Sequence, residues 1–396
     1  MADMQAGIGP FLGVFLQQRG WTTGAIGLVM TLGGVAGMLV TAPAGALVDA
    51  TRRKRVYVIL SGLFTVLASS LIWVSQSFWV IAGSQIATAI AGAAIGPAVA
   101  GITLGIARQK GFNRQNGRNQ AFNHAGNVAG AALSGFLGWK FGFVAIFWLA
   151  AVFGVLSITS VLMIPRKTID DDAARGLAED KGGGGQAKGW RVLIGCKPLL
   201  VLAACLGLFH LGNGAMLPLY GLAVVAAHKG DPASTVALTI VVAQAVMVLA
   251  SVVAMRVAET RGYWLVILIT FIALPIRGLV AASVIQGWGV YPVQVLDGIG
   301  AGLQSVAVPG LVARILNGTG RVNVGQGAVM TVQGVGAALS PAIGGAIAQV
   351  VGYQIAFVIL GSFALGSLAL WLGFRRVTQE ACECPSGTGP SEPTTA

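Results

Sequence analysis

The stretch Gly45-Ala46-Leu47-Val48-Asp49-Ala50-Thr51-Arg52-Arg53-Lys54-Arg55 joins two long apolar segments. The segment before it runs roughly from Ala25 to Val48, and the next one begins at Val56. Two membrane-length helices that are joined by so short a loop form a hairpin. Because basic residues concentrate in cytoplasmic loops, the four bases of this stretch predict that the loop faces the cytoplasm.

Composition places the whole chain in the membrane. The 396 residues are 55% hydrophobic and 10% charged, with a mean hydropathy of +0.80. A soluble domain carries about 25% charged residues. A closed β-barrel is excluded because its strands alternate apolar and polar residues, whereas these apolar runs are continuous. At roughly 30 residues for a helix and its connection, the length allows about twelve or thirteen spans.

The net charge of +12 raises the question of a nucleic-acid partner. The positions of the bases argue against one. Of the 25 lysines and arginines, only Arg19, Lys140, Lys229 and Arg277 fall outside the segments expected in the cytoplasm. This distribution is the positive-inside bias of a membrane protein, so no nucleic-acid binding is expected.

Cofactor and enzyme signals are weak throughout the chain. The tail sequence Cys382-Glu383-Cys384 does not provide four well-spaced metal ligands, and with Cys196 and Cys205 it predicts reduced thiols and no bound metal. The glycine run 182–185 lacks the Gly-x4-Gly-Lys-Ser/Thr pattern of a phosphate loop. No paired nucleophile and base is visible. We therefore expect neither an ATPase site, nor a cofactor, nor an enzyme.

Ten further apolar runs follow the hairpin's first helix. The predicted spans are 56–74, 78–107, 121–138, 141–164, 198–226, 233–255, 263–285, 288–315, 325–351 and 354–374. The segment 108–118, with four bases and no acid, is predicted to be a cytoplasmic loop.

Polar stretches divide the chain into parts. Mixed charges and glycines in 165–197 predict a flexible cytoplasmic linker. The predicted organisation is a six-helix bundle at 1–164, this linker, a second six-helix bundle at 198–376, and a disordered cytoplasmic tail at 377–396.

The first helix is shorter than a membrane span, since its apolar character runs only from Met1 to about Leu16. The run Pro218-Leu219-Tyr220-Gly221 of the seventh helix can be laid over Pro10-Phe11-Leu12-Gly13. The seventh helix begins near Pro198, so the first is expected to begin about ten residues before Met1. This comparison predicts a truncated start or a misassigned start codon.

The two halves of the chain repeat each other. The run Gly130-Ala131-Ala132-Leu133-Ser134 recurs as Gly336-Ala337-Ala338-Leu339-Ser340, 206 residues later. At the same offset Asn127 falls on Gln333 and Gln120 on Gln326. Repeats in the same orientation, six helices apart, predict two bundles related by an axis normal to the membrane.

The hairpin loop resembles the signature loop between helices two and three of the major facilitator superfamily. It has Gly45, Leu47, Asp49 and the following bases, with Arg52 where a second glycine is usual. In the fourth helix Gln85 stands where the family usually has an arginine. The resemblance covers essentially the whole chain and implies a fold of twelve transmembrane helices in two six-helix bundles.

Two further motifs resemble those of the family. The tenth helix carries Asp297-Gly298-Ile299-Gly300-Ala301-Gly302, with Gln294 in the place of the arginine. The fifth has Gly126-x3-Gly130-Ala131-x2-Ser134-Gly135, a degraded form of the motif associated with antiporters. The resemblance implies alternating access, in which the two bundles rock about a central site.

The signature loop has two interpretations. Gly45, Leu47, Asp49, Arg52 and Arg53 are expected to latch the inward-closed state, with Asp49 accepting hydrogen bonds from a helix N-terminus or an arginine. The alternative is that the bases only orient the hairpin.

Ionisable residues within the membrane are costly and so indicate function. Asp3, Arg277 and Asp297 stand out. Counted along their helices, Arg277 and Asp297 both lie roughly 12–14 Å from the same surface and are expected to pair. Two roles stay open: a structural ion pair, or a transport site in which Asp297 binds a proton or a substrate cation and Arg277 tunes its proton affinity.

Polar side chains on the helices expected to line the cavity suit hydrogen bonding to a polar or amphipathic solute. They are Gln5, Asn127, His210, Asn213, Gln304 and Gln333. His210 is also a candidate proton carrier, because histidine titrates near neutral pH.

We expect a secondary transporter of the bacterial inner membrane that exports a small amphipathic compound in exchange for protons. It should act as a monomer, with both termini in the cytoplasm if the first helix is complete. Two alternatives remain: proton-coupled uptake of a small metabolite or chelate, and a membrane receptor or scaffold that does not transport.

Overall fold

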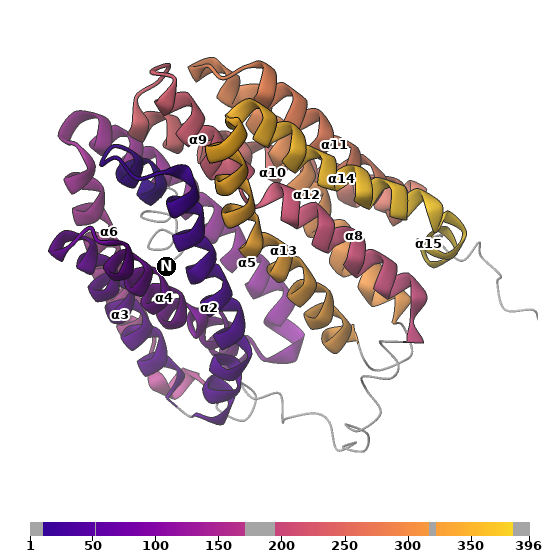
Figure 1. Cartoon of the computed structure of the whole chain (residues 1–396). Helices are drawn as coiled ribbons and strands as arrows, with labels where there is room; N and C mark the ends of the chain where they lie inside the picture. The colour runs from indigo at the N-terminus through magenta and orange to yellow at the C-terminus, as the bar shows by residue number, and fades with distance from the viewer. Residues whose placement is uncertain (1–10, 52, 171–194, 317–321, 383–396) are drawn as a thin grey trace, which may run out of the picture.

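A computed structural model describes residues 11–51, 53–170, 195–316 and 322–382. Helices account for nearly all of these residues (Figure 1). The helices of the first half, coloured indigo to magenta, form one group, and those of the second half, coloured rose to yellow, lie beside it.

The first half begins with a short helical segment at 11–17. Its longer helices are α2 Thr23–Ala50, α3 Lys54–Val74, α4 Phe78–Ala93, α5 Ile95–Phe141 and α6 Phe143–Met163. The second half contains α8 Lys197–Asn213, α9 Met216–Ala226, α10 Pro232–Arg261, α11 Tyr263–Ser283, α12 Val290–Ile315, α13 Val322–Val351, α14 Tyr353–Gly373 and α15 Arg375–Cys382.

Within the described residues, nine helical stretches are long and apolar enough to cross a membrane. The region of α4 and α5 supplies the fourth and fifth predicted spans, because α5 continues from one into the other. The segment at 11–17 is the described part of the first. The signature loop is short, since α2 ends at Ala50 and α3 begins at Lys54.

The predicted loop at 108–118 is wrong. The chain is helical there except at Arg108, whose backbone angles of φ 54° and ψ 177° break α5 in two. Across this break, Asn119 Nδ2 donates a hydrogen bond to Thr103 Oγ1 at 2.9 Å. One residue is therefore enough to reverse the chain, and the basic residues that follow continue as helix, for which lysine, arginine and glutamine have good propensity.

Two other helix boundaries differ from the prediction. The seventh span is interrupted between α8 and α9, where the backbone N–H of Ala215 donates to Ser340 Oγ of α13 at 2.8 Å. The fourth span is interrupted at Ala94, between α4 and α5. A side chain from another helix thus satisfies a backbone donor that the interrupted ladder leaves free.

The tail was predicted to be disordered from residue 377, and this is wrong as far as Cys382. Helix α15 lies against the bundle, with Thr378 and Cys382 buried. Trp264 Nε1 donates to Thr378 Oγ1 at 3.1 Å, and Arg314 Nη1 donates to the carbonyl oxygen of Cys382, also at 3.1 Å. Residues 383–396 lie outside the described part of the chain.

The start of the predicted linker lies on α5. The backbone N–H of Asp170 donates to the carbonyl of Gly105 at 3.1 Å, and the Asp170 carboxylate pairs with Arg108 at 3.3 Å. Both side chains are exposed enough that this pair adds little stability. Most of the linker, 171–194, lies outside the described residues, so its flexibility remains a prediction.

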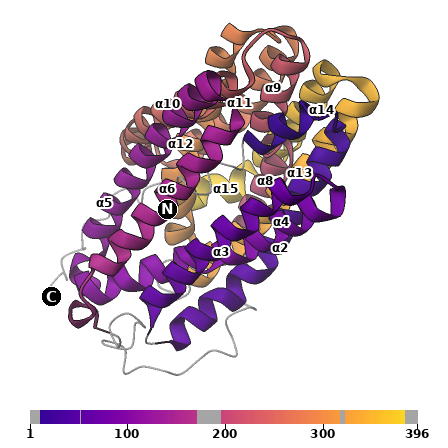
Figure 2. The same cartoon turned by 90° about the vertical axis from the view of Figure 1, so that its left-hand side faces the viewer.

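Helices from the two halves pack together in pairs. Helix α13 runs along α2, and α10 runs along α5 (Figure 2). In the first pair, an added Cβ on Gly34 would lie 3.2 Å from the Cβ of Ala338, and the backbone N–H of Ala342 donates to Thr31 Oγ1 at 3.0 Å. Small residues thus let the backbones approach, as in other membrane helix pairs.

The close approaches along α2 begin at its first turn. The backbone N–H of Gly24 donates to Gln349 Oε1 at 3.1 Å, and further along α2 Met38 contacts Gly334. Gly24 and Met38 are fourteen residues apart, which corresponds to roughly 21 Å of helix. The observed contacts therefore join the bundles at the end opposite the basic hairpin.

Candidate functional site

An ion pair lies inside the second bundle. Arg277 Nη1 of α11 is 2.7 Å from Asp297 Oδ1 of α12, and the exposed fractions of the two side chains are 1% and 14%. The predicted pairing of these two residues is therefore present. Arg277 is enclosed, whereas the Asp297 carboxylate is partly accessible.

Glycines on the neighbouring faces hold the two helices in position. Gly278, next to Arg277, packs on α14, where an added Cβ would lie 3.0 Å from the Cα of Gly361. Gly298, next to Asp297, packs on α10, where an added Cβ would lie 2.6 Å from the carbonyl oxygen of Ala243. Because these close contacts fix the rotation of α11 and α12, the neighbouring Arg277 and Asp297 face each other.

Two amides also accept hydrogen bonds from Arg277. Its Nη1 also donates to Asn213 Oδ1 of α8 at 2.6 Å, and its Nη2 donates to Gln294 Oε1 of α12 at 3.2 Å. In the sequence, Gln294 stands out only because it takes the place of an arginine in a family motif. Its signal as a site residue is its position three before Asp297, which places both on one face of the helix.

A second polar group continues along the same helices. His210 Nε2 lies 3.1 Å from Gln304 Oε1 and 3.2 Å from Gln333 Nε2. His210 precedes Asn213 by three residues on α8, and Gln304 follows Asp297 by seven on α12, so each pair shares a helix face.

We call Asn213, Arg277, Gln294, Asp297, His210, Gln304 and Gln333 together the polar strip. Gln333 is next to Gly334, which contacts Met38 of α2. The strip therefore reaches the junction between the bundles. Five residues that were predicted separately (His210, Asn213, Asp297, Gln304 and Gln333) lie in it together with Arg277.

Other predicted site residues are not part of the strip. Asn127 is partly exposed on α5, and no hydrogen bond of the described part of the chain links it to the strip. Asp3 and Gln5 lie outside the described residues. Sequence analysis missed His124 of α5, whose Nδ1 lies 2.9 Å from Gln244 Oε1 of α10 and so links the two bundles.

The signature-loop residues are only partly described. Gly45 and Asp49 lie in the last turns of α2, but their side chains, like Arg52 as a whole, are outside the described part. Leu47 is exposed, and the backbone N–H of Arg53 donates to Thr51 Oγ1 at 3.1 Å. The latch therefore stays a prediction.

A nearby base has an observed partner. Arg55 donates from Nε and Nη2 to the carbonyl oxygens of Val161 and Leu162, at 3.2 and 2.8 Å. This base therefore ties the start of α3 to the end of α6.

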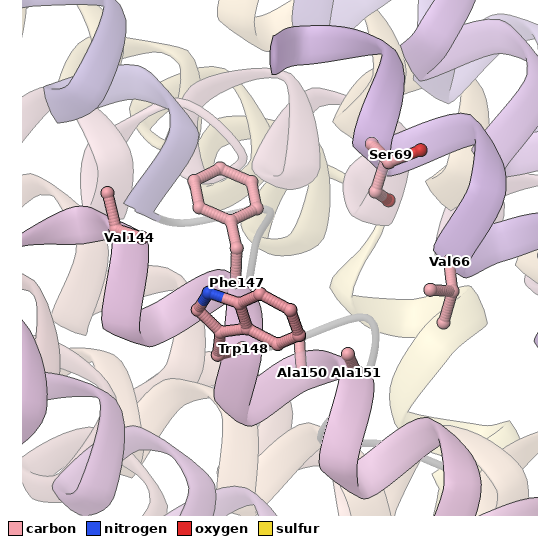
Figure 3. Close-up of a pocket in the computed structure, with 8 residues that line it drawn as sticks. Val66, Ser69, Val144, Phe147, Trp148, Ala150 and Ala151 are labelled. Atoms are coloured by element: carbon pink, nitrogen blue, oxygen red, sulfur yellow. The ribbon is translucent and has the colours of Figure 1, made fainter.

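Clusters of metal ligands and pockets outside the polar strip are the other places where a site could lie. Among the described residues, His, Cys, Asp and Glu side chains form no group of three that could hold a metal ion. A pocket of about 330 Å³ lies between α3 and α6 (Figure 3). It is lined by Val66, Ser69, Ser70, Val144, Phe147, Trp148, Ala150 and Ala151. Trp148 is 71% exposed, so this pocket lies at the surface of the first bundle, whereas the polar strip lies in the second.

Two helical bundles joined along glycine-lined helix pairs, with an ion pair buried inside the second bundle, are typical of membrane transporters. The chain belongs to the Major Facilitator Superfamily, whose family model matches residues 2–324. The predicted family is thereby confirmed, and with it membership among integral membrane transporters.

A protein of similar sequence is also described as a transporter of this family. An uncharacterized MFS-type transporter of Mycobacterium tuberculosis, found in strains H37Rv and CDC 1551, is 36% identical over 374 residues. The match covers 94% of this chain and 90% of that protein.

Solved structures show the same fold. A mutant of the nucleoside transporter NupG superposes with a TM-score of 0.78 at 12% identity, covering 95% of this chain and 96% of that one. A bacterial homolog of the human lysosomal transporter Spinster, inward-facing and unoccupied, gives 0.76 at 14% identity, covering 97% and 96%. The predicted fold of twelve helices in two bundles is confirmed by these likenesses.

Proposed function

We propose that this chain is a proton-coupled secondary transporter of a small amphipathic solute, with the polar strip as its central site. The observation that carries the proposal is the ion pair between Arg277 and Asp297 inside a membrane bundle. A buried ion pair seldom adds stability compared with apolar residues of the same volume. Ionisable groups retained within the membrane typically serve proton relay or substrate binding.

Asp297 is the proton site in this proposal. It is the more accessible member of the pair, and its carboxylate takes a single hydrogen bond from Arg277 Nη1. Protonation removes the charge that holds Nη1 and weakens this contact. The strip therefore has two charge states, which a transport cycle can couple to the positions of the bundles.

Alternating access requires the contacts between the bundles at the outer end and at the inner end of the helices to open and close in turn. With the basic hairpin in the cytoplasm, the contacts from Gly24 to Met38 close the outer side, so the described state faces inward. We place the transporter in the plasma membrane, which is the inner membrane of a bacterium, and expect it to function as a monomer.

The direction of transport has two candidates. Export is supported by the antiporter-like motif of α5, because Gly135 of that motif packs on Ala237 of α10 in the junction that must move. Uptake is supported by the hydrogen-bonding side chains of the strip, which suit a polar metabolite. NupG, to which the fold is similar, is a nucleoside transporter.

A growth screen tests the proposal. A transport-deficient bacterial host would express the wild-type chain or Asp297→Asn and grow on a panel of toxic compounds. Raised tolerance indicates export, and raised sensitivity indicates uptake. Either phenotype should disappear with Asp297→Asn and persist with the control Asp231→Asn, because Asp231 only caps α10 and asparagine caps equally well.

Two results would contradict the proposal. One is an Asp297→Asn protein that confers the full wild-type phenotype at normal expression. The other is the complete lack of solute flux in proteoliposomes for every compound of the panel, which would favour a receptor or scaffold.

A further inference from the structure

The polar strip contains hydrogen-bond donors that no protein group satisfies. Arg277 Nε, Gln294 Nε2 and Gln304 Nε2 are buried without a partner. In the described part of the chain, the two buried side-chain oxygens without a partner, on Gln17 and Thr88, belong to other helices. The fully buried side-chain atoms of the strip that lack a partner are therefore all N–H donors.

The orientation of the amides follows from the chemistry of arginine. A guanidinium group has only donors, so Asn213 and Gln294 must turn their oxygens toward Arg277. Their NH₂ groups then point away from it and offer further donors. Gln304 Oε1 faces His210, and Gln304 Nε2 has no partner. A ligand that fits this arrangement supplies acceptor oxygens.

Charge narrows the class of ligand. With Asp297 ionised, the pair is neutral; with Asp297 protonated, Arg277 keeps one uncompensated positive charge within the membrane. An anion that binds at this moment restores neutrality. A monoanionic carboxylate replaces the Asp297 carboxylate with the same geometry, whereas a phosphate monoester brings about two negative charges for one cation.

We propose that the solute is an organic acid whose carboxylate binds Arg277 while Asp297 is protonated. The inference rests on the proposed function. One proton moves from water to the Asp297 carboxylate, and one anion binds Arg277 and the free amide N–H groups. Release reverses both steps, because the deprotonated Asp297 pairs again with Arg277 and displaces the anion.

In this scheme one proton is always transported together with one anion, and the concentration gradients of the two decide the direction of transport. The proton and the anion travel together, so the transporter is a symporter and moves no net charge. An acid that accumulates inside is exported, and an acid supplied outside is taken up. The apolar part of the solute is expected near Phe209, whose ring lies 5.4 Å from that of His210.

A binding experiment on the purified full-length protein tests the proposal without a known substrate. The probes are benzoate, the neutral benzamide and the cationic benzylammonium, followed by tryptophan fluorescence and thermal stabilisation. Asp297→Asn mimics the protonated carboxyl group and should bind benzoate about tenfold or more tightly than the wild type at neutral pH. Adding Arg277→Gln to this variant should abolish benzoate binding.

The pH dependence gives a second readout. Between about pH 6 and 8 benzoate stays ionised, so its affinity for the wild type should rise as the pH falls, because the scheme requires one proton to bind with each anion. In Asp297→Asn this dependence should vanish, which separates Asp297 from His210. If Asp297→Asn does not fold, the wild-type pH series carries the test alone.

Three results would overturn the inference: benzylammonium binding more tightly than benzoate, no benzoate binding to folded Asp297→Asn, or a wild-type benzoate affinity that does not change with pH. The proposed function fails separately. If benzoate does not bind but Asp297→Asn still abolishes proton-driven transport, only the assignment of an organic acid is lost. If benzoate binds as expected but Asp297→Asn transports with normal coupling, the proton site is lost instead.

Discussion

The substitution Gly27→Ala should destabilise the closed junction between α2 and α13, and so it tests alternating access directly. An added Cβ on Gly27 would lie 2.8 Å from the carbonyl carbon of Pro341 and closer still to its oxygen, and 3.3 Å from the Cα of Gly345. Carbon atoms in contact are normally about 3.5–4.0 Å apart. The two helix backbones must therefore separate by roughly 1 Å to admit one methyl group.

Overpacking of this kind costs about 1–3 kcal/mol. The cost applies only to the state in which the junction is closed, because the two helices part when it opens. A coupling of about 1–3 kcal/mol corresponds to a shift of about 5–150-fold in the equilibrium between the two states. Gly27→Ala should therefore raise the population that is open at the outer end without unfolding either bundle.

The assay measures accessibility of the junction. Thr31→Cys places a thiol in it, because Thr31 is buried there and bonded to Ala342, in a background without the native cysteines. A membrane-impermeant maleimide added outside should label this thiol about 5–150-fold faster in the presence of Gly27→Ala. The control is Gly83→Ala, since a Cβ at Gly83 meets nothing within 4 Å. Equal labelling rates in folded Gly27→Ala and Gly83→Ala proteins would show that the added methyl group does not open the junction between α2 and α13.

Three further predictions concern the ion pair, the junction between α5 and α10, and the C-terminal helix. Arg277→Met alone should destabilise the protein by about 3–5 kcal/mol, because it leaves the Asp297 carboxylate unpaired. Adding Asp297→Leu should restore thermal stability in detergent, and equal melting temperatures of the single and double variants would contradict this. His124→Ala should weaken the closed state by about 0.5–1.5 kcal/mol, and a double-mutant cycle with Gln244→Ala in the labelling assay should show coupling rather than additivity. Thr378→Val should speed amide hydrogen exchange in α15 and leave the transmembrane helices unchanged, since it removes the acceptor of the Trp264 indole; unchanged exchange in α15 would show that this bond does not hold the helix.

The sequence was sufficient for features that follow from length, hydropathy and depth. The spans, the repeat and the pairing of Arg277 with Asp297 follow from counting residues along apolar helices, because a helix rises by a fixed distance per residue. The break at Arg108 was not predictable in this way. The break comes from the positive φ of one residue, and a hydropathy profile contains no information about a single dihedral angle.

The hydrogen bonds between the residues of the polar strip were harder to predict than the residues themselves. Gln294 and Gln304 take part because of the rotation of α12, which packing against α10 fixes. The bond between His124 and Gln244 joins residues 120 positions apart on different bundles. A single sequence carries no record of such long-range pairs, so only three-dimensional packing could reveal them.

The proposed function requires Asp297, in its pair with Arg277, to take up and release a proton during transport. In the alternative, the pair only stabilises the fold. The most direct measurement is solute-driven proton movement in proteoliposomes, followed with a pH-sensitive dye, for the wild type and for Asp297→Asn. The wild type should move protons with the solute, whereas Asp297→Asn, folded and still able to bind the solute, should move none. Normal proton movement by the folded Asp297→Asn protein would show that Asp297 is not the proton site and that the ion pair is a structural feature.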